Sequence, residues 1–114
     1  MEEVVYDTNQ LISLLKGGKH SAKGFTTILN VIEFPKALGL KELAVIYPTL
    51  DDYDESLKIS AALLRNGTPL PAVDILIASI CVRRNLTLCT RDSHFMNIKS
   101  VRSTFKLELT KYLR

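Results

Sequence analysis

The sequence predicts an α/β fold, a parallel sheet with helices on both faces. Short β-prone runs alternate with helical runs along the whole chain, which is the pattern of such sheets. The first β-prone run passes directly into a polar turn and a helix, as a βα unit does. The 114 residues suit one domain and show no repeat or linker, so we expect a single domain over residues 1–114.

Composition and charge are those of an ordinary globular protein. Apolar residues make up 46% of the chain, and the net charge of +3 permits a polyanionic partner without requiring one. Cys81 and Cys89 lie in apolar contexts, so we interpret both as core residues rather than as a disulfide or metal site. With no signal peptide and no apolar run of about 18 residues, we expect a cytoplasmic protein with no membrane association.

The first half of the chain begins with a strand at Val4–Tyr6. The leucine-rich helical pattern that follows takes Thr8 or Asn9 as its N-cap and ends at Gly17-Gly18.

A second βα unit follows, with a short strand at Phe25–Thr27. Asn30 is the expected N-cap of a helix that carries Glu33, and Pro35 is expected to kink this helix. Leu43–Tyr47 is the next strand.

A long helix opens the second half. Thr49-x-x-Asp52 resembles a capping box, and the helix after it has an apolar face made of Leu57, Ala61 and Leu64.

The next helix, Val73–Arg83, is apolar at nearly every position and should be buried on most sides. Asp74 lies in its first turn, where the helix dipole favours an anion. Asn85 ends this helix, and a strand at 86–90 follows. We expect an irregular turn over 93–98 and a last short strand near Val101.

Four of the twelve acidic residues end a strand or lie on an apolar helix: Asp7, Glu33, Asp74 and Asp92. The other eight, Asp52 among them, are interpreted as surface acids. Each of the four has an ordinary structural explanation, as a helix cap, a partner of the helix dipole or a solvated side chain.

Together, however, the four acids indicate a cation site. Asp7 and Asp92 end strands that would be neighbours in a doubly wound sheet, so their side chains would share a crevice. Four carboxylates there would raise the pKa of one another, and a divalent cation would relieve the repulsion. Oxygen-only ligands favour Mg²⁺ or Mn²⁺ over zinc.

The segments Tyr6–Asn9, the Glu33 helix, Pro71–Ser79 and Thr87–Phe95 resemble the PIN-domain family, and most of all its VapC-type toxin ribonucleases. The resemblance covers nearly the whole chain in the family's order. It implies a PIN-like three-layer α/β/α sandwich with a four- or five-stranded parallel sheet. It also implies a Mg²⁺- or Mn²⁺-dependent endoribonuclease that has RNA as substrate, pairs with an inhibitory antitoxin and often forms a homodimer.

Carried across residue by residue, the catalytic and metal-binding acids are Asp7, Glu33, Asp74 and Asp92, and the residues that support them are Thr8, Asn9 and Thr90. Two departures from the family concern Glu33. The segment between Asp7 and Glu33 is short, and Pro35 can displace Glu33 from the metal.

Basic side chains would hold the RNA backbone: Arg91, Lys16, Lys19 and Lys23. Arg83 and Arg84 are expected to be solvated or at an interface. His94 is interpreted as a surface histidine rather than a catalytic base, and His20 as a phosphate contact or a residue without function.

Two other functions stay open. A weakly active or inactive PIN-like domain would act as an RNA- or protein-binding scaffold. A response-regulator-like domain would need a lysine near the end of its last strand, and Lys99 and Lys106 are poorly placed for that role.

Overall fold

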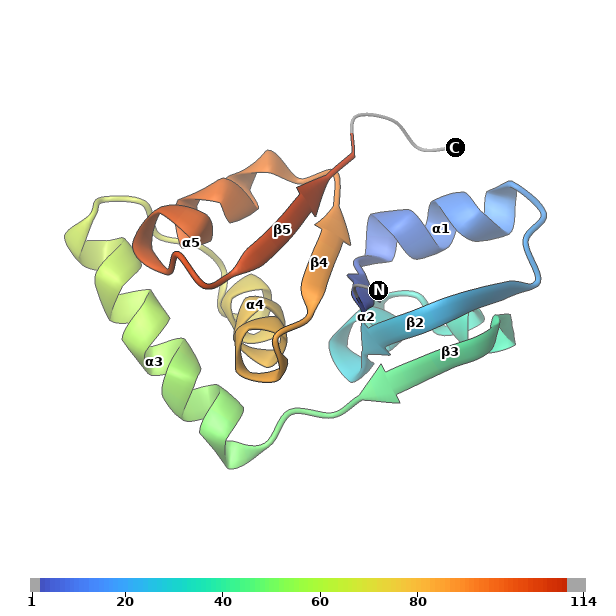
Figure 1. Cartoon of the computed structure of the whole chain (residues 1–114), viewed down its shortest axis with the longest axis horizontal. Coiled ribbons are helices and arrows are strands. Elements are labelled where there is room, and N and C mark those ends of the chain that lie inside the picture. Colours follow the sequence, from blue (N-terminus) through green and yellow to red (C-terminus); the bar gives the residue numbers. More distant parts are fainter. Residues whose placement is uncertain (1–2, 111–114) are drawn as a thin grey trace.

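The computed structural model describes residues 3–110 and contains a five-stranded, all-parallel sheet in the order β3-β2-β1-β4-β5 (Figure 1). The strands are β1 (Val4–Tyr6), β2 (Ser21–Thr27), β3 (Lys41–Ile46), β4 (Thr87–Thr90) and β5 (Lys106–Leu109). The helices are α1 (Thr8–Lys16), α2 (Ile28–Glu33), α3 (Leu50–Arg65), α4 (Ala72–Arg84) and α5 (Met96–Val101), with 3-10 turns η1 (Pro35–Gly39) and η2 (Ser93–Phe95). The predicted α/β fold with a parallel sheet is confirmed. That residues 1–114 form one domain stays a prediction.

Two hydrophobic cores cover the two faces of the sheet and produce the three predicted layers. The larger core packs the sheet against α3, α4 and α5, and the smaller core packs α1 and the α2–η1 segment against the other face. Val5 belongs to the larger core and Tyr6 contacts the smaller one, because successive side chains of a strand point to opposite faces.

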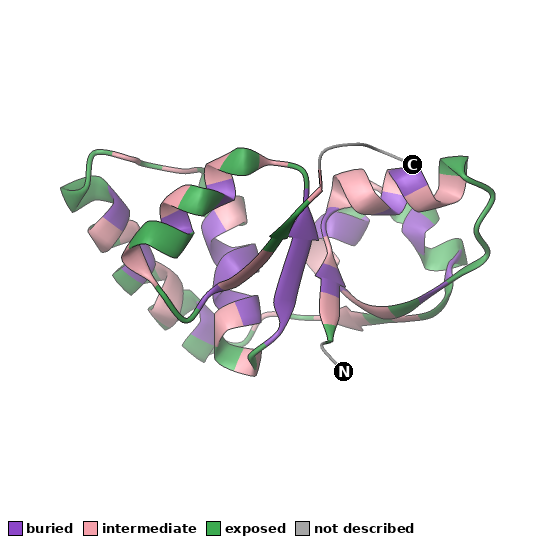
Figure 2. Cartoon of the chain, turned by 45° about the horizontal axis from the view of Figure 1, so that its top comes forward, coloured by how far each residue is buried: buried purple, intermediate pink, exposed green. Residues whose placement is uncertain are grey.

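The centre of the larger core is α4 with β4. Seven consecutive residues of α4, Ile75–Cys81, are buried, and so is every residue of β4 (Figure 2). As predicted, Cys81 and Cys89 are buried free thiols and Asn85 ends α4. Asn85 does so in the left-handed conformation, which is common at this position. Among residues 3–110, the helices lack the length and apolar character needed to cross a membrane.

Two helices begin earlier than the sequence predicts. Asp7, rather than Thr8 or Asn9, caps α1, because its carboxylate accepts a hydrogen bond from the Thr8 N–H. Thr27, rather than Asn30, caps α2. Asn30 lies in the first turn and completes a capping box by accepting from the Thr27 N–H and hydroxyl.

Proline and the C-terminal segment also behave differently from the prediction. Pro35 starts η1 after α2 has ended at Glu33, so it terminates the helix instead of kinking it. The expected irregular turn over 93–98 is η2 followed by α5, and the expected strand near Val101 is β5, which starts at Lys106. Phe95 and Ile98 are both fully buried, and their spacing is that of one helical face.

The apolar face predicted for α3 is the exposed one. Leu57 and Leu64 are 71% and 64% exposed, whereas Ile59 and Leu63 are fully buried. The helix carries two apolar stripes, and the Ile59 stripe packs on α4, where polar side chains of the two helices also meet. On this stripe the Ser56 hydroxyl donates to Ser79 Oγ of α4 at 2.8 Å.

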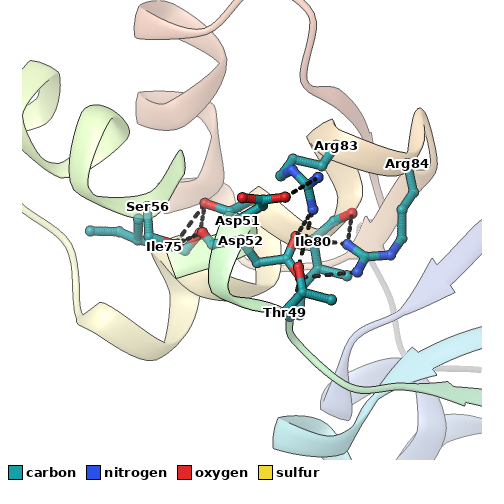
Figure 3. A network of polar contacts seen from close by, with 9 residues as sticks. Thr49, Asp51, Asp52, Ser56, Ile75, Ile80, Arg83 and Arg84 are labelled. Carbon is teal, nitrogen blue, oxygen red and sulfur yellow. Dashed lines mark hydrogen bonds and ion pairs between the residues drawn. The ribbon is translucent and has the colours of Figure 1, made fainter. Parts of the chain in front are cut away.

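Asp52 lies on the same inner stripe and is fully buried, which corrects its interpretation as a surface acid. Arg84 donates to both carboxylate oxygens, at 2.8 and 2.9 Å, and Arg83 donates to Oδ1 at 3.0 Å (Figure 3). The Thr49 N–H donates to Oδ2 at 2.7 Å, so the predicted capping box is confirmed. Arg83 and Arg84 are therefore partners of a buried acid that joins the start of α3 to the end of α4.

The two arginines and the Thr49 N–H hold the pKa of Asp52 far below its ordinary value, although burial opposes them. Because the folded-state pKa is lowered, the stabilisation is complete above the pKa of an unfolded aspartate, about 3.9. It is lost as the pH falls below that value.

We predict that Asp52→Asn lowers the free energy of unfolding at pH 7 by about 3 kcal/mol, because it leaves Arg84 without a counter-ion and Arg83 with the 3.5 Å contact to the exposed Asp51. Thermal denaturation from pH 3 to 7 checks this, with the exposed Asp54→Asn as the matched control. The variant should approach the wild type in stability as the pH falls below about 4. An equal loss at all pH values would show that charge is not the cause.

The exposed face of α3 gives a second prediction. Leu63→Ala should cost about 2–5 kcal/mol of unfolding free energy, because it empties a fully buried site. Leu57→Ala is the same chemical change six residues earlier, on the outer stripe. It should change the free energy of unfolding by no more than about 0.5 kcal/mol. Urea denaturation of both variants compares them, and a larger loss for Leu57→Ala would reverse the assignment of the two faces.

Candidate active site

The candidate site lies at the carboxyl end of the two central strands. β1 pairs with β4 with Tyr6 opposite Cys89, and the Asp7 N–H donates to the Cys89 carbonyl at 3.0 Å. Asp7 therefore follows its strand at the level of Thr90, as predicted for neighbouring parallel strands. Asp92 comes next, and its N–H donates to Thr90 Oγ1 at 3.1 Å.

Asp7 is 6% exposed, and both of its carboxylate oxygens accept hydrogen bonds. Oδ1 accepts from the Thr8 N–H and from the Asn30 amide, each at 2.9 Å. Oδ2 accepts from the Thr90 hydroxyl at 2.7 Å and from the Asn9 amide at 3.5 Å. The three supporting residues thus surround Asp7. Asn30 is a fourth, and its position three residues after Thr27 is the sequence signal that could have identified it.

Glu33 reaches the site through a chain of hydrogen bonds. Its carboxylate accepts from the Thr8 hydroxyl at 2.7 Å, and the same Thr8 oxygen accepts from the Asn30 amide at 3.0 Å. That amide also donates to Asp7. Glu33 is exposed at the end of α2. Because these hydrogen bonds link it to Asp7, Pro35 has not removed it from the neighbourhood of Asp7.

Asp74 lies in the first turn of α4, with its side chain 26% exposed. Its Oδ2 is 3.1 Å from Nε2 of His94. His94 is the middle residue of η2, which begins directly after Asp92. The His94 ring stacks on Phe95, with ring centroids 4.9 Å apart. His94 is therefore not an isolated surface histidine. The sequence signal for it was its place between Asp92 and a phenylalanine of the core.

Burial and neighbouring acidic charges act on Asp7 and Asp74. Burial, and next the charge of Asp92, raise the pKa of Asp7, while hydrogen bonds from Thr90, Thr8 and Asn30 act against the shift. Burial also raises the pKa of Asp74, as do the charges of Asp7 and Asp92, and His94 opposes them. The repulsion that the sequence predicts thus acts on Asp7 and Asp74, where burial is the larger cause of the raised pKa.

The side chains do not form a ready-made metal cage. Within the part of the chain that the structure describes, no group of three or more His, Cys, Asp or Glu side chains is close enough to hold a metal ion. The predicted gathering of all four acids around one ion is therefore not seen. Instead, neighbouring acidic charges act on Asp7 and Asp74. Glu33 is joined to Asp7 by hydrogen bonds through Thr8 and Asn30.

The predicted RNA-binding residues do not lie together. The backbone N–H of Arg91 donates to Asn9 Oδ1 at 3.3 Å, so Arg91 lies at the site. Lys16 is at the far end of α1, and Lys19 follows it. Lys23 is near the start of β2, the neighbour of β1, and so lies toward the amino end of the strands, whereas Asp7 follows the carboxyl end of β1. All four are exposed.

No family model matches the sequence, and no curated protein matches it either. Solved structures do match. A VapBC2 complex from Rickettsia felis, bound to a DNA fragment from its promoter, contains a chain that is 17% identical, with a TM-score of 0.75 and coverage of 93% of this chain and 97% of that one. The chain has a PIN-like fold.

Two further structures agree with this. A DNA-bound VapBC from Salmonella typhimurium matches at 18% identity and a TM-score of 0.73, over 95% of this chain and 98% of that one. VapBC-5 from Mycobacterium tuberculosis, of the VapBC family of toxin–antitoxin systems, matches at 16% identity and a TM-score of 0.72. The match covers 98% of this chain and 100% of that one. The PIN-like fold thus extends over nearly the whole length of each chain.

The raised pKa of Asp74 in this PIN-like fold gives a third prediction. A carboxyl whose folded-state pKa is raised contributes stability at acid pH, and this contribution is lost as the pH rises through that pKa. Asp74→Asn cannot ionise. Without divalent ions, its melting temperature relative to the wild type should therefore increase as the pH rises from about 4 to 7. Thermal denaturation in EDTA measures this, and a difference independent of pH would contradict it.

Proposed function

We propose that the chain is a Mg²⁺- or Mn²⁺-dependent endoribonuclease that hydrolyses RNA phosphodiester bonds as the toxin of a toxin–antitoxin pair. One observation carries the proposal. Asp7 and Asp92 follow the neighbouring strands β1 and β4, and Asp74 comes from α4. Burial first, and then the charges of neighbouring acids, raise the pKa of Asp7 and of Asp74. Clustered acids at such a position are typical of a functional site rather than a stabilising feature.

The donor set suits a hard divalent cation. Every proposed ligand, Asp7, Glu33, Asp74 and Asp92, offers carboxylate oxygen, the donor type that Mg²⁺ and Mn²⁺ prefer. Mg²⁺ commonly keeps several water ligands and takes one or two carboxylates together with substrate phosphates. A site without a preformed cage of three side chains is therefore compatible with this ion.

When bound, such an ion would lower the pKa of a water ligand and offset the charge that develops on the phosphate oxygens. The chain's own residues do the rest. Four donors hold the Asp7 carboxylate in one orientation, so it needs little reorganisation to take a ligand. Thr8 and Asn30 hold Glu33 relative to Asp7.

The substrate would be held by its phosphates. Arg91 lies next to Asp92 and is exposed, so its guanidinium can contact the backbone of an RNA strand at the site. Lys16, Lys19 and Lys23 are further away and would contact a strand that continues past α1. Contacts of this kind give salt-sensitive binding without base preference.

The proposed partner is an antitoxin protein. The matching solved structures are toxin–antitoxin complexes, and two of them contain DNA. By this likeness of fold, a partner chain would inhibit the nuclease, and the toxin would act in the cytoplasm, as a homodimer in many such systems.

A second candidate is a PIN-like scaffold that binds RNA or protein and cleaves little. It is favoured by the lack, within residues 3–110, of three potential ligands close enough to hold a metal.

The nuclease proposal predicts that the purified chain cleaves single-stranded RNA in Mn²⁺ or Mg²⁺ but not in EDTA. Asp74→Asn should reduce the rate about a hundredfold or more, because metal assistance supplies several kcal/mol. Asp54→Asn, an exposed aspartate outside the site, is the matched control. Intact RNA across varied sequences in Mn²⁺ would favour the scaffold, and equal rates for both variants would place the activity elsewhere.

A further inference from the structure

His94 is held in place by the hydrophobic core. Its ring stacks on Phe95, which is fully buried and packs near Phe105 with ring centroids 6.4 Å apart. η2 fixes the backbone here, because the Phe95 N–H donates to the Asp92 carbonyl at 3.3 Å. The imidazole thus has a defined position beside Asp74, although its side chain is 39% exposed.

Asp7 and Asp74 are held very differently. Four donors fix both oxygens of Asp7. Within residues 3–110, the Asp74 carboxylate has one hydrogen bond, between its Oδ2 and His94 Nε2. Asp74 also carries the repulsion of two neighbouring acids. Without His94, little would keep its carboxylate turned toward the site.

We propose that His94 is a positioning residue of the candidate site: its Nε2–H donates to Asp74 Oδ2, fixes the carboxylate and leaves Oδ1 available for a divalent cation. This inference rests on the proposed function. Carboxylate ligands in metal sites are commonly held by such outer hydrogen bonds. His94 supplies such a hydrogen bond to Asp74.

A positioning role differs from that of a general base. A base oriented by Asp74 through Nε2–H would take up a proton on Nδ1. A positioning role needs a donor at this point and no change of protonation. It therefore predicts that a neutral donor can replace the imidazole.

The experiment measures Mn²⁺ binding to the metal-free full chain by isothermal titration calorimetry at pH 7. His94→Phe keeps a ring that can stack on Phe95 but removes the donor, and it should weaken Mn²⁺ binding about 10- to 100-fold. His94→Gln places an amide N–H near the former Nε2 and should restore most of the affinity. His20→Phe, which changes the chain's other histidine, is the matched control and should bind as the wild type does.

The outcomes separate the two claims. Wild-type affinity in His94→Phe, or no recovery in His94→Gln, overturns the role of His94 and leaves the proposed nuclease standing. Absence of Mn²⁺ binding by the wild-type chain overturns the proposed function and the role of His94 with it. If His94→Phe melts well below the wild type, His94→Asn replaces it, because its shorter amide stops short of Asp74.

Discussion

A single buried carboxylate constrains much of this structure. An ionised Asp7 without partners would cost several kcal/mol, and the fold supplies partners from three elements: Thr8 of α1, Asn30 of α2 and Thr90 of β4. The same bonds that satisfy Asp7 therefore fix the start of α1 and the first turn of α2 relative to the central strands. Structural and functional explanations of Asp7 are compatible here, since the residue is a helix cap and also the centre of the acidic site.

α4 connects two electrostatically opposite environments. At its C-terminal end, Arg83 and Arg84 enclose a buried acid and lower its pKa. At its N-terminal end, burial and the charges of neighbouring acids raise the pKa of Asp74, and His94 is its partner. The first arrangement stabilises the helix contact with α3, and the second stores repulsion that a bound cation can relieve. A buried helix whose charges are paired at one end can tolerate charge repulsion at the other end.

The sequence was sufficient for the parallel α/β sheet and for the pairing of the two strands that precede Asp7 and Asp92. β-prone runs that end in Asp7 and Asp92 imply a shared edge, because parallel neighbours end together. It was insufficient wherever two local patterns compete. α3 has two apolar stripes, and only packing reveals that Asp52, Ile59 and Leu63 face inward. Asn30 and His94 were missed as site residues because their partners, Asp7 and Asp74, are distant in the chain.

Both natural thiols lie inside the larger core or the sheet. Burial raises the pKa of the Cys89 thiol to about 11 and that of Cys81 further still, so almost no thiolate exists at neutral pH. Alkylating reagents should therefore leave the native chain unmodified. A fluorophore could then be attached to one cysteine introduced on the surface without replacing the natural pair. The rate at which Cys81 is alkylated would in turn measure how often the core opens.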